Sequence, residues 1–233
     1  MGMKTHPPVK IMAQEKKIDL VLYDLDGTLQ DSVPLIVESF QKAYEAVLGE
    51  CTRSVEDLKS YIGRPLGDSF ERHDKETSDK LIEAYLEYNM RRMKEGAISL
   101  FPGVKESLER LKEKGISQGI VTAKRKSSAM VTIDSLDIAK YFDVMVFGED
   151  TARSKPFGDP LVEAARRFGT TDMKKVLYVG DAASDLLSAK DCGCYFALVD
   201  WTMMPKDEIG KLGPDYVLSS LDEISCIIGN TEL

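Results

Sequence analysis

Short apolar runs that alternate with amphipathic stretches are the feature of this sequence that most constrains its fold. Such runs lie at residues 18–23, 116–121, 143–147, 175–179, 195–199 and, more weakly, 216–218. Between the later runs, apolar residues recur at helical spacing. This alternation favours a parallel sheet wound with helices over an all-helical or all-strand fold. We therefore expect an α/β fold: a doubly wound parallel sheet core of five or six strands, Rossmann-like in its layout.

Residues 32–97 interrupt the alternation and form an insert. Its stretches suit helices at residues 32–48, 55–61, 66–73 and 78–93, and none is a convincing strand. We expect an α/β core of residues 14–30 and 98–233, with a small all-helical cap domain of residues 31–97 inserted after the first strand. Because the insert begins directly after the loop that follows this strand, it can lie over the end of the strand as a lid.

The charge of the chain argues against a nucleic-acid partner. Its 233 residues include 31 Lys and Arg against 39 Asp and Glu, which gives a formal net charge of −8. Such a protein does not attract a phosphate backbone without local basic groups. No apolar run approaches the roughly 20 residues that span a bilayer, so we expect no membrane partner. The absence of coiled-coil heptads favours a monomer, with a dimer as the alternative.

The N-terminus and the cysteines indicate a cytoplasmic protein. Residues 1–16 lack the apolar segment of a secretory signal, and we interpret them as a disordered lead-in. The four cysteines form no CxxC pair. We expect them to be reduced, as in a cytoplasm.

Polar residues follow four of the predicted strands, at the edge of the sheet where open α/β folds bind ligands. In chain order they are Asp24, Asp26 and Gly27, then Thr122 and Ala123, then Lys155, and finally Asp181 and Asp185. Because the carboxyl ends of parallel strands meet at one edge, we expect these residues to converge there.

The acidic residues of this set indicate phosphoryl transfer assisted by a metal ion. Clustered carboxylates repel one another unless a cation lies among them, and oxygen ligands suit Mg²⁺. This ion is usually held by few protein carboxylates, which leaves Asp24 able to attack a phosphorus atom as nucleophile. Asp26, two residues further on, can protonate the leaving group.

The remaining residues of the set can bind the transferred phosphoryl group. Thr122 and the following amide of Ala123 can donate hydrogen bonds to its oxygens, and Lys155 can neutralise its charge. Gly27 permits a tight turn and a close approach of backbone N–H groups to an oxyanion.

Each of these motifs has a plainer explanation when it is taken alone. An isolated Asp-x-Asp-Gly is more often a turn, and Thr122 alone could cap a helix. Lys155 alone could be a surface charge, and Asp185 could be an acid that favours a helix N-terminus. Four motifs in this order overturn these explanations.

Together, the motifs resemble those of the haloacid dehalogenase-like hydrolase superfamily, which has a DxDGT motif, a Thr, a Lys and a GDxxxD motif in this order. The position of the helical insert resembles the helical-cap group, which includes phosphoglycolate phosphatase, pyrophosphatase and β-phosphoglucomutase relatives. The resemblance implies an aspartyl-phosphate intermediate at Asp24 and acid–base work by Asp26. It also implies that Mg²⁺ is held by Asp24, by Asp181 and by the backbone carbonyl of Asp26, with Asp185 as a supporting acid.

In the insert, residues 61–66 resemble the cap loop that these enzymes direct at the substrate. Arg64 is the candidate for recognising an anionic leaving group, because a guanidinium pairs bidentately with carboxylate or phosphate. In a loop, this Arg could equally be solvated.

The sequence therefore predicts a phosphatase that uses Mg²⁺ to hydrolyse a small phosphorylated metabolite, with a phosphoglycolate-like substrate or pyrophosphate as the candidates. Two alternatives stay open. A β-phosphoglucomutase-type phosphomutase would use the same core and return the phosphoryl group to a sugar. A catalytically silent scaffold would use the same fold without chemistry, since fold does not fix function.

Overall fold

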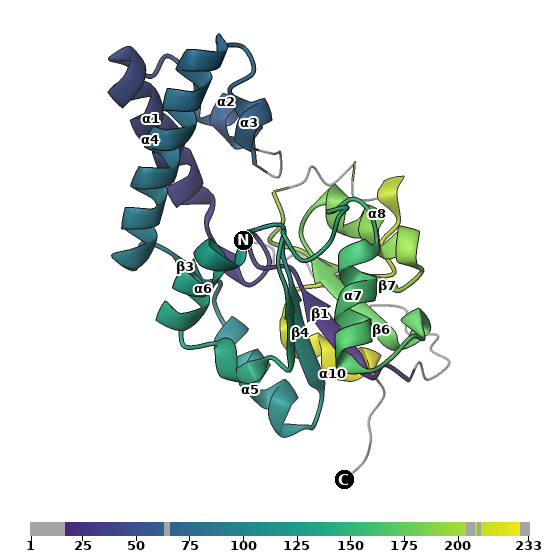
Figure 1. The fold of residues 1–233 in the computed structure, drawn as a ribbon. Coiled ribbons are helices and arrows are strands. Elements are labelled where there is room, and N and C mark those ends of the chain that lie inside the picture. The colour runs from purple at the N-terminus through teal and green to yellow at the C-terminus, as the bar shows by residue number, and fades with distance from the viewer. Residues whose placement is uncertain (1–16, 63–65, 204–207, 209–210, 229–233) are drawn as a thin grey trace, which may run out of the picture.

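A six-stranded parallel sheet forms the centre of the computed structural model, which describes residues 17–62, 66–203, 208 and 211–228 (Figure 1). The strands lie in the order β5-β4-β1-β6-β7-β8, and every neighbouring pair is parallel. Their bounds are β1 Leu20–Tyr23, β4 Ser117–Val121, β5 Val144–Val146, β6 Val176–Gly180, β7 Tyr195–Val199 and β8 Tyr216–Leu218. The first strand is central, and chain crossings to either side of it make the fold doubly wound.

Helices cover both faces of the sheet. One face packs against α5 (Val104–Glu113), α6 (Lys126–Ser135) and α10 (Ile224–Ile227), and the other against α7 (Asp159–Phe168) and α8 (Ala183–Cys192). Short 3₁₀ helices occur at Ala139–Tyr141, Met173–Lys175 and Leu221–Glu223. Since side chains alternate along a strand, Val21 and Tyr23 of β1 enter the first core while Leu20 and Leu22 enter the second. This burial on both faces explains why the strand is apolar throughout.

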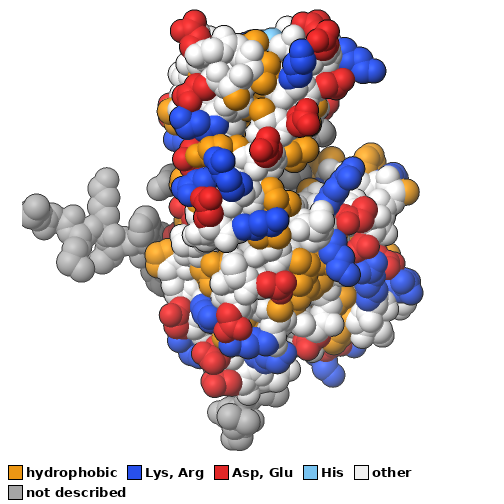
Figure 2. Space-filling model, turned by 60° about the vertical axis from the view of Figure 1, so that its left-hand side comes forward, with side chains coloured by type: hydrophobic (Ala, Val, Ile, Leu, Met, Phe, Trp, Pro, Cys, Tyr) orange, Lys and Arg blue, Asp and Glu red, His pale blue; other side chains and the backbone are white. Residues whose placement is uncertain are grey.

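Four helices between β1 and β4 form a separate lobe, which we call the helical lobe. They are α1 (Val33–Leu48), α2 (Val55–Lys59), α3 (Leu66–Ser69) and α4 (Lys75–Lys94). Phe40 of α1 lies at the centre of their apolar core, against the rings of Tyr61, Phe70 and Tyr85. Figure 2 shows this lobe at the top, with a notch between it and the larger part that contains the sheet. The visible face carries basic and acidic side chains interspersed.

A short antiparallel ribbon joins the two parts. It pairs β2 (Gln30–Asp31) with β3 (Ser99–Leu100), so the chain leaves for the helical lobe and returns from it side by side. The sequence analysis did not anticipate this ribbon, because runs of two residues carry no periodicity. No helix of the described residues is both long enough and apolar enough to cross a membrane.

The predicted fold class is confirmed, and the helix ends differ locally for identifiable reasons. The helix expected at residues 66–73 ends at Ser69, and the one expected from residue 78 begins at Lys75. Asp74 is the reason, since its carboxylate accepts a hydrogen bond from the backbone N–H of Thr77 at 3.0 Å and caps the longer helix.

Replacing Phe40 by Ala should destabilise the helical lobe by about 3–5 kcal/mol, because it removes a fully enclosed ring and leaves a cavity. Urea unfolding followed by circular dichroism measures this loss. Leu86→Ala on α4 is the matched control, since Leu86 is 54% exposed and its removal should change the free energy of unfolding by less than about 1 kcal/mol. Equal effects of the two substitutions would contradict the packing described here.

Candidate active site

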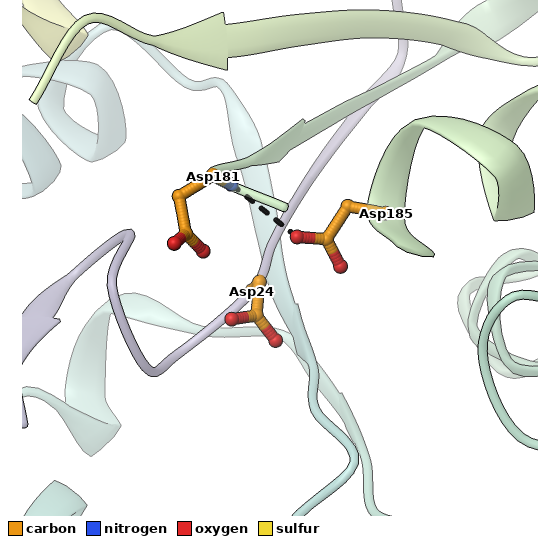
Figure 3. A group of neighbouring side chains, drawn as sticks. All are labelled: Asp24, Asp181 and Asp185. Carbon is orange, nitrogen blue, oxygen red and sulfur yellow. Dashed lines mark hydrogen bonds between the residues drawn. The ribbon is translucent and has the colours of Figure 1, made fainter. Parts of the chain in front are cut away.

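The predicted site residues converge at the carboxyl edge of the sheet. Asp24 follows β1, Thr122 follows β4 and Asp181 follows β6, while Lys155 lies on the loop between β5 and α7 and Asp185 in the first turn of α8. Figure 3 shows the side chains of Asp24, Asp181 and Asp185 as close neighbours. Each offers one oxygen, and these oxygens all lie within 4.8 Å of one another. The three acids thus form one cluster, as the sequence predicts.

Lys155 is the cation inside this cluster. Its Nζ lies 2.6 Å from Oδ1 of Asp24 and 2.7 Å from Oδ1 of Asp185, and its side chain is 8% exposed. The Tyr178 hydroxyl also lies 3.2 Å from Nζ. Burial alone would lower the pKa of Lys155, but the two carboxylates raise it well above its usual range. The side chain is therefore a permanent ammonium group held against the predicted nucleophile.

Asp185 is held on both of its oxygens. Oδ1 contacts Lys155 and accepts a hydrogen bond from the Tyr178 hydroxyl at 3.0 Å. Oδ2 accepts from the backbone N–H groups of Asp181 and Ala182 at 3.3 and 3.1 Å. Both oxygens of Asp185 are thus engaged with the lysine, the Tyr178 hydroxyl and the loop after β6.

Asp24 and Asp181 hold their protons more tightly than ordinary carboxyl groups. Burial, followed by the charge of Asp185, raises the pKa of Asp24 to about 7, although Lys155 opposes the shift. The pKa of Asp181 is also raised well above its usual range, by burial and then by Asp185 and Asp24. One lysine does not compensate the two buried carboxylates of Asp24 and Asp185 and the partly buried one of Asp181, so the cluster favours a further cation.

Gly27 shapes the loop that carries the first two acids. Its φ of +82° lies in the left-handed region, and a Cβ at this position would stand 2.6 Å from the carboxyl carbon of Asp181. Thr28, the next residue, donates its hydroxyl to Oδ1 of Asp181 at 3.2 Å. A glycine is required here because the loop passes directly over an acid of the cluster.

Asp26 lies beside the cluster and has different partners. Its Oδ1 accepts from Lys124 Nζ at 2.9 Å and from Gln30 Nε2 at 2.8 Å. Burial opposes ionisation, but the charge and hydrogen bond of Lys124 lower the pKa of Asp26. The sequence analysis gave Lys124 no role. The sequence signal for a role of Lys124 at the site was its position two residues after Thr122, in the loop that follows β4.

Thr122 and Ala123 lie where the loop after β4 reaches the site. Thr122 is buried, and its Oγ1 accepts a hydrogen bond from the backbone N–H of Lys124 at 3.2 Å. Ala123 is exposed. Arg64, the candidate from the insert, lies outside the described residues.

Two aromatic residues at the site were missed by the sequence analysis. Tyr178 is fully buried in β6, where its position within an apolar run resembles simple core packing. Trp201 follows β7 and donates its indole N–H to the backbone oxygen of Thr28 at 3.3 Å. Their contacts at the site join residues that lie far apart in the chain, and no local sequence pattern reveals such contacts.

Comparison with known proteins decides the family. The family model described as haloacid dehalogenase-like hydrolase matches residues 21–199, which include every described residue of the cluster. The chain belongs to this family. The expectation of a haloacid dehalogenase-like phosphatase is confirmed.

Relatives match this haloacid dehalogenase-like chain over nearly its whole length. The pyrophosphatase PpaX of Halalkalibacterium halodurans is 33% identical over 91% of this chain and 98% of its own. The pyrophosphatase PpaX of Bacillus velezensis is 31% identical over 92% of this chain and 98% of its own. A crystal structure described as a predicted phosphoglycolate phosphatase from Haemophilus somnus has a TM-score of 0.82 and 23% identity. It covers 91% of this chain and 98% of its own, and this likeness shows the fold alone.

Replacing Lys155 by Met should destabilise the protein in chelator-treated buffer, more at pH 8 than at pH 5. Without the lysine, the pKa values of Asp24 and Asp181 rise further above their unfolded values. A carboxyl group with a raised folded-state pKa stabilises the fold when protonated, and this contribution is lost as the pH rises through that pKa. We expect a loss of about 3–5 kcal/mol at pH 8 in urea unfolding.

The control is Lys105→Met, which removes an exposed pair with Asp137 at 3.3 Å. It should cost no more than about 1 kcal/mol at either pH. A loss for Lys155→Met that is the same at pH 5 and pH 8 would contradict the buried charge balance.

Proposed function

We propose that this phosphatase hydrolyses a small phosphorylated metabolite through an aspartyl-phosphate intermediate at Asp24, with Mg²⁺ as cofactor. The single observation that carries the proposal is the placement of Asp24 between two further carboxylates and the ammonium group of Lys155. Pyrophosphate is the first substrate to test, because the relatives that cover the chain are named pyrophosphatases. A phosphoglycolate-like substrate is the second.

The residues present fit a magnesium ion. Oxygen ligands are the ones that Mg²⁺ prefers, and the carboxyl groups of Asp24 and Asp181 lack enough positive charge around them to ionise readily. With the backbone carbonyl of Asp26 they would hold the ion, while Asp185 stays engaged with Lys155 and the loop. The bound ion would neutralise the approaching phosphate and favour ionised Asp24.

In the first step, a carboxylate oxygen of Asp24 forms a bond to phosphorus as the bond from phosphorus to the leaving oxygen breaks. Asp26 gives its proton to that oxygen. Lys155 and the hydroxyl of Thr122 stabilise the charge on the transferred oxygens. In the second step, Asp26 takes a proton from water and the water oxygen forms a bond to phosphorus. The bond from phosphorus to the Asp24 oxygen breaks, which releases inorganic phosphate and restores the Asp24 carboxylate.

Asp26 must change partners in this sequence of steps. In the structure Lys124 and Gln30 hold it as a carboxylate, the form required to activate water. To act as an acid it must release Lys124, because a carboxylate beside an ammonium group binds a proton weakly. We propose that movement of the helical lobe, which the β2–β3 ribbon connects to the same loop, accompanies this exchange.

We also propose that residues 31–97 act as a cap domain over a core of residues 14–30 and 98–233. The separate apolar core of the helical lobe supports these boundaries. Closure of such a lobe would exclude bulk water while the phosphoryl group transfers, and reopening would release product.

Replacing Asp24 by Asn should lower turnover by roughly a thousandfold or more, since the amide is a poor nucleophile. Phosphate release is measured from pyrophosphate, phosphoglycolate, sugar phosphates and nucleotides, with Mg²⁺ and with chelator. Asp19→Asn, at an exposed pair with Lys175, is the control and should retain activity. Turnover that survives Asp24→Asn would refute the nucleophile. Turnover that requires a sugar bisphosphate activator would favour the phosphomutase.

Excess MgCl₂ should raise the melting temperature by about 5–10 °C at pH 8 and much less at pH 5. The raised pKa of Asp24, about 7, means that this carboxyl is protonated at pH 5 and ionised at pH 8. At a pH below the pKa of Asp24 in the unfolded chain, the proton on this carboxyl contributes fully to the stability of the fold. This contribution is lost as the pH rises through the folded-state pKa of about 7. Mg²⁺ competes with that proton, so its stabilisation increases with pH.

Differential scanning fluorimetry measures both conditions. Asp181→Asn should remove most of the shift at pH 8, since it deletes one proposed ligand. A shift that is equal at the two pH values, or that survives Asp181→Asn, would place Mg²⁺ elsewhere.

A further inference from the structure

A cleft of about 500 Å³ opens beside the acidic cluster, between the core and the helical lobe. Gly27 and Asp181 form the end nearest the nucleophile, and Val55 and Lys59 of α2 form the opposite side. Any group attached to a phosphate at Asp24 would extend into this space. The cleft therefore faces the leaving group of the proposed reaction.

The described lining is mainly apolar. Its apolar members are Val33, Pro34, Val37, Val55, Phe101, Trp201 and Met203. Phe101 and Trp201 come from the core, and their ring centroids lie 5.7 Å apart at an interplanar angle of 39°. The two rings thus provide a continuous aromatic wall.

This aromatic wall is fixed to the catalytic loop. The indole N–H of Trp201 donates to the backbone oxygen of Thr28, and the backbone N–H of Phe101 donates to the oxygen of Leu29 at 3.1 Å. The next residue after the tryptophan, Thr202, donates its hydroxyl to the backbone oxygen of Asp181. The wall and the acidic cluster therefore keep a constant relative position.

The charges of the described lining do not suit an anionic leaving group. Apart from Asp181, which is a proposed magnesium ligand, Asp31 and Glu38 are acidic, and Glu38 is partly neutralised by Arg92 at 3.7 Å. Lys59 is the cation of this lining, and its Nζ already lies 3.3 Å from Glu56. A leaving phosphate or carboxylate would meet more negative than positive charge there.

Resting on the function proposed above, we propose that the cleft selects phosphate monoesters with a flat, apolar leaving group, which stacks on Trp201 and Phe101. The rigid wall provides area and shape for an aromatic ring, and stacking of this kind is tolerant of ring chemistry. Water is displaced from the apolar lining as the ring enters. Pyrophosphate gains neither the stacking on the wall nor the displacement of water from the apolar lining, so this cleft discriminates against it.

Phenyl phosphate and pyrophosphate are the paired probes, compared by kcat/KM in the presence of Mg²⁺. Trp201→Ala should lower the value for phenyl phosphate about tenfold more than the value for pyrophosphate, because both substrates lose the hydrogen bond from Trp201 to Thr28 but only phenyl phosphate loses the stacking surface. Trp201→Phe keeps a ring but loses the hydrogen bond to Thr28, and should retain most of the activity toward phenyl phosphate. Phe101→Leu, which keeps apolar volume, provides a second test should Trp201→Ala not fold.

Binding can be measured without turnover, because Trp201 is the one tryptophan of the sequence. In the Asp24→Asn variant, phenyl phosphate should shift the emission of Trp201 at concentrations where pyrophosphate and inorganic phosphate do not. An equal loss for both substrates in Trp201→Ala would show a structural role and overturn the proposal, as would an equal emission response to all three probes.

The two proposals fail in distinguishable ways. If Asp24→Asn retains turnover of phenyl phosphate, the aspartyl-phosphate mechanism is wrong, but the emission titration still reports whether the cleft holds a ring. If Asp24→Asn is inactive and the substitutions at the wall do not discriminate between the two substrates, the mechanism stands and the selectivity is refuted.

Discussion

The contact of Lys155 with Asp24 and Asp185 is the interaction on which the rest of the site depends. A buried ion pair is costly to form, and three clustered carboxyl groups, two of them buried, outnumber the one ammonium group. The fold tolerates this arrangement because the Tyr178 hydroxyl donates to the same oxygen of Asp185 that Lys155 contacts, and two backbone N–H groups donate to the other. Asp24 and Asp181 lack enough positive charge around them to ionise readily, and this deficit is what makes the cluster suited to a divalent cation.

The sheet supplies the rigidity that such a cluster requires. The strand β1 lies between β4 and β6 and is buried on both faces, so the loop that carries Asp24 begins from a fixed point. Asp181 and Asp185 follow the neighbouring strand β6, and the loop with Gly27 passes directly over them. By contrast, the helical lobe has its own apolar core and connects through two short strands. The acidic cluster and the helical lobe are thus built from different parts of one chain.

The leaving-group side of the site is less constrained by chemistry than the phosphate side. Relatives named pyrophosphatase align over nearly the whole chain, yet the described lining of the cleft combines an aromatic wall with three acidic residues. Under the proposed mechanism, the residues that act on the phosphoryl group must keep fixed positions around Asp24. The contacts of the leaving group can vary without disturbing that chemistry, so selectivity has to be argued from this chain's own side chains.

The sequence by itself determined the order of the strands along the chain, the position of the helical insert and the residues at the strand ends. Buried strands must be apolar, helices need their own periodicity, and the acids at Asp24 and Asp181 break these patterns where each strand ends. These signals are local, which is why they can be read from one sequence. The β2–β3 ribbon was not found, since its strands are too short to show a pattern.

Only the tertiary structure decided which side chains meet. It paired Asp26 with Lys124, placed the Tyr178 hydroxyl against Lys155, and brought Trp201 over Thr28, a residue 173 positions earlier. Each of these contacts joins segments far apart in the chain. A tyrosine within an apolar run, such as Tyr178, has the same local pattern whether it only packs or also contacts a charged side chain. The physical reason is that packing and charge act through space, whereas sequence patterns report only what neighbours along the chain require.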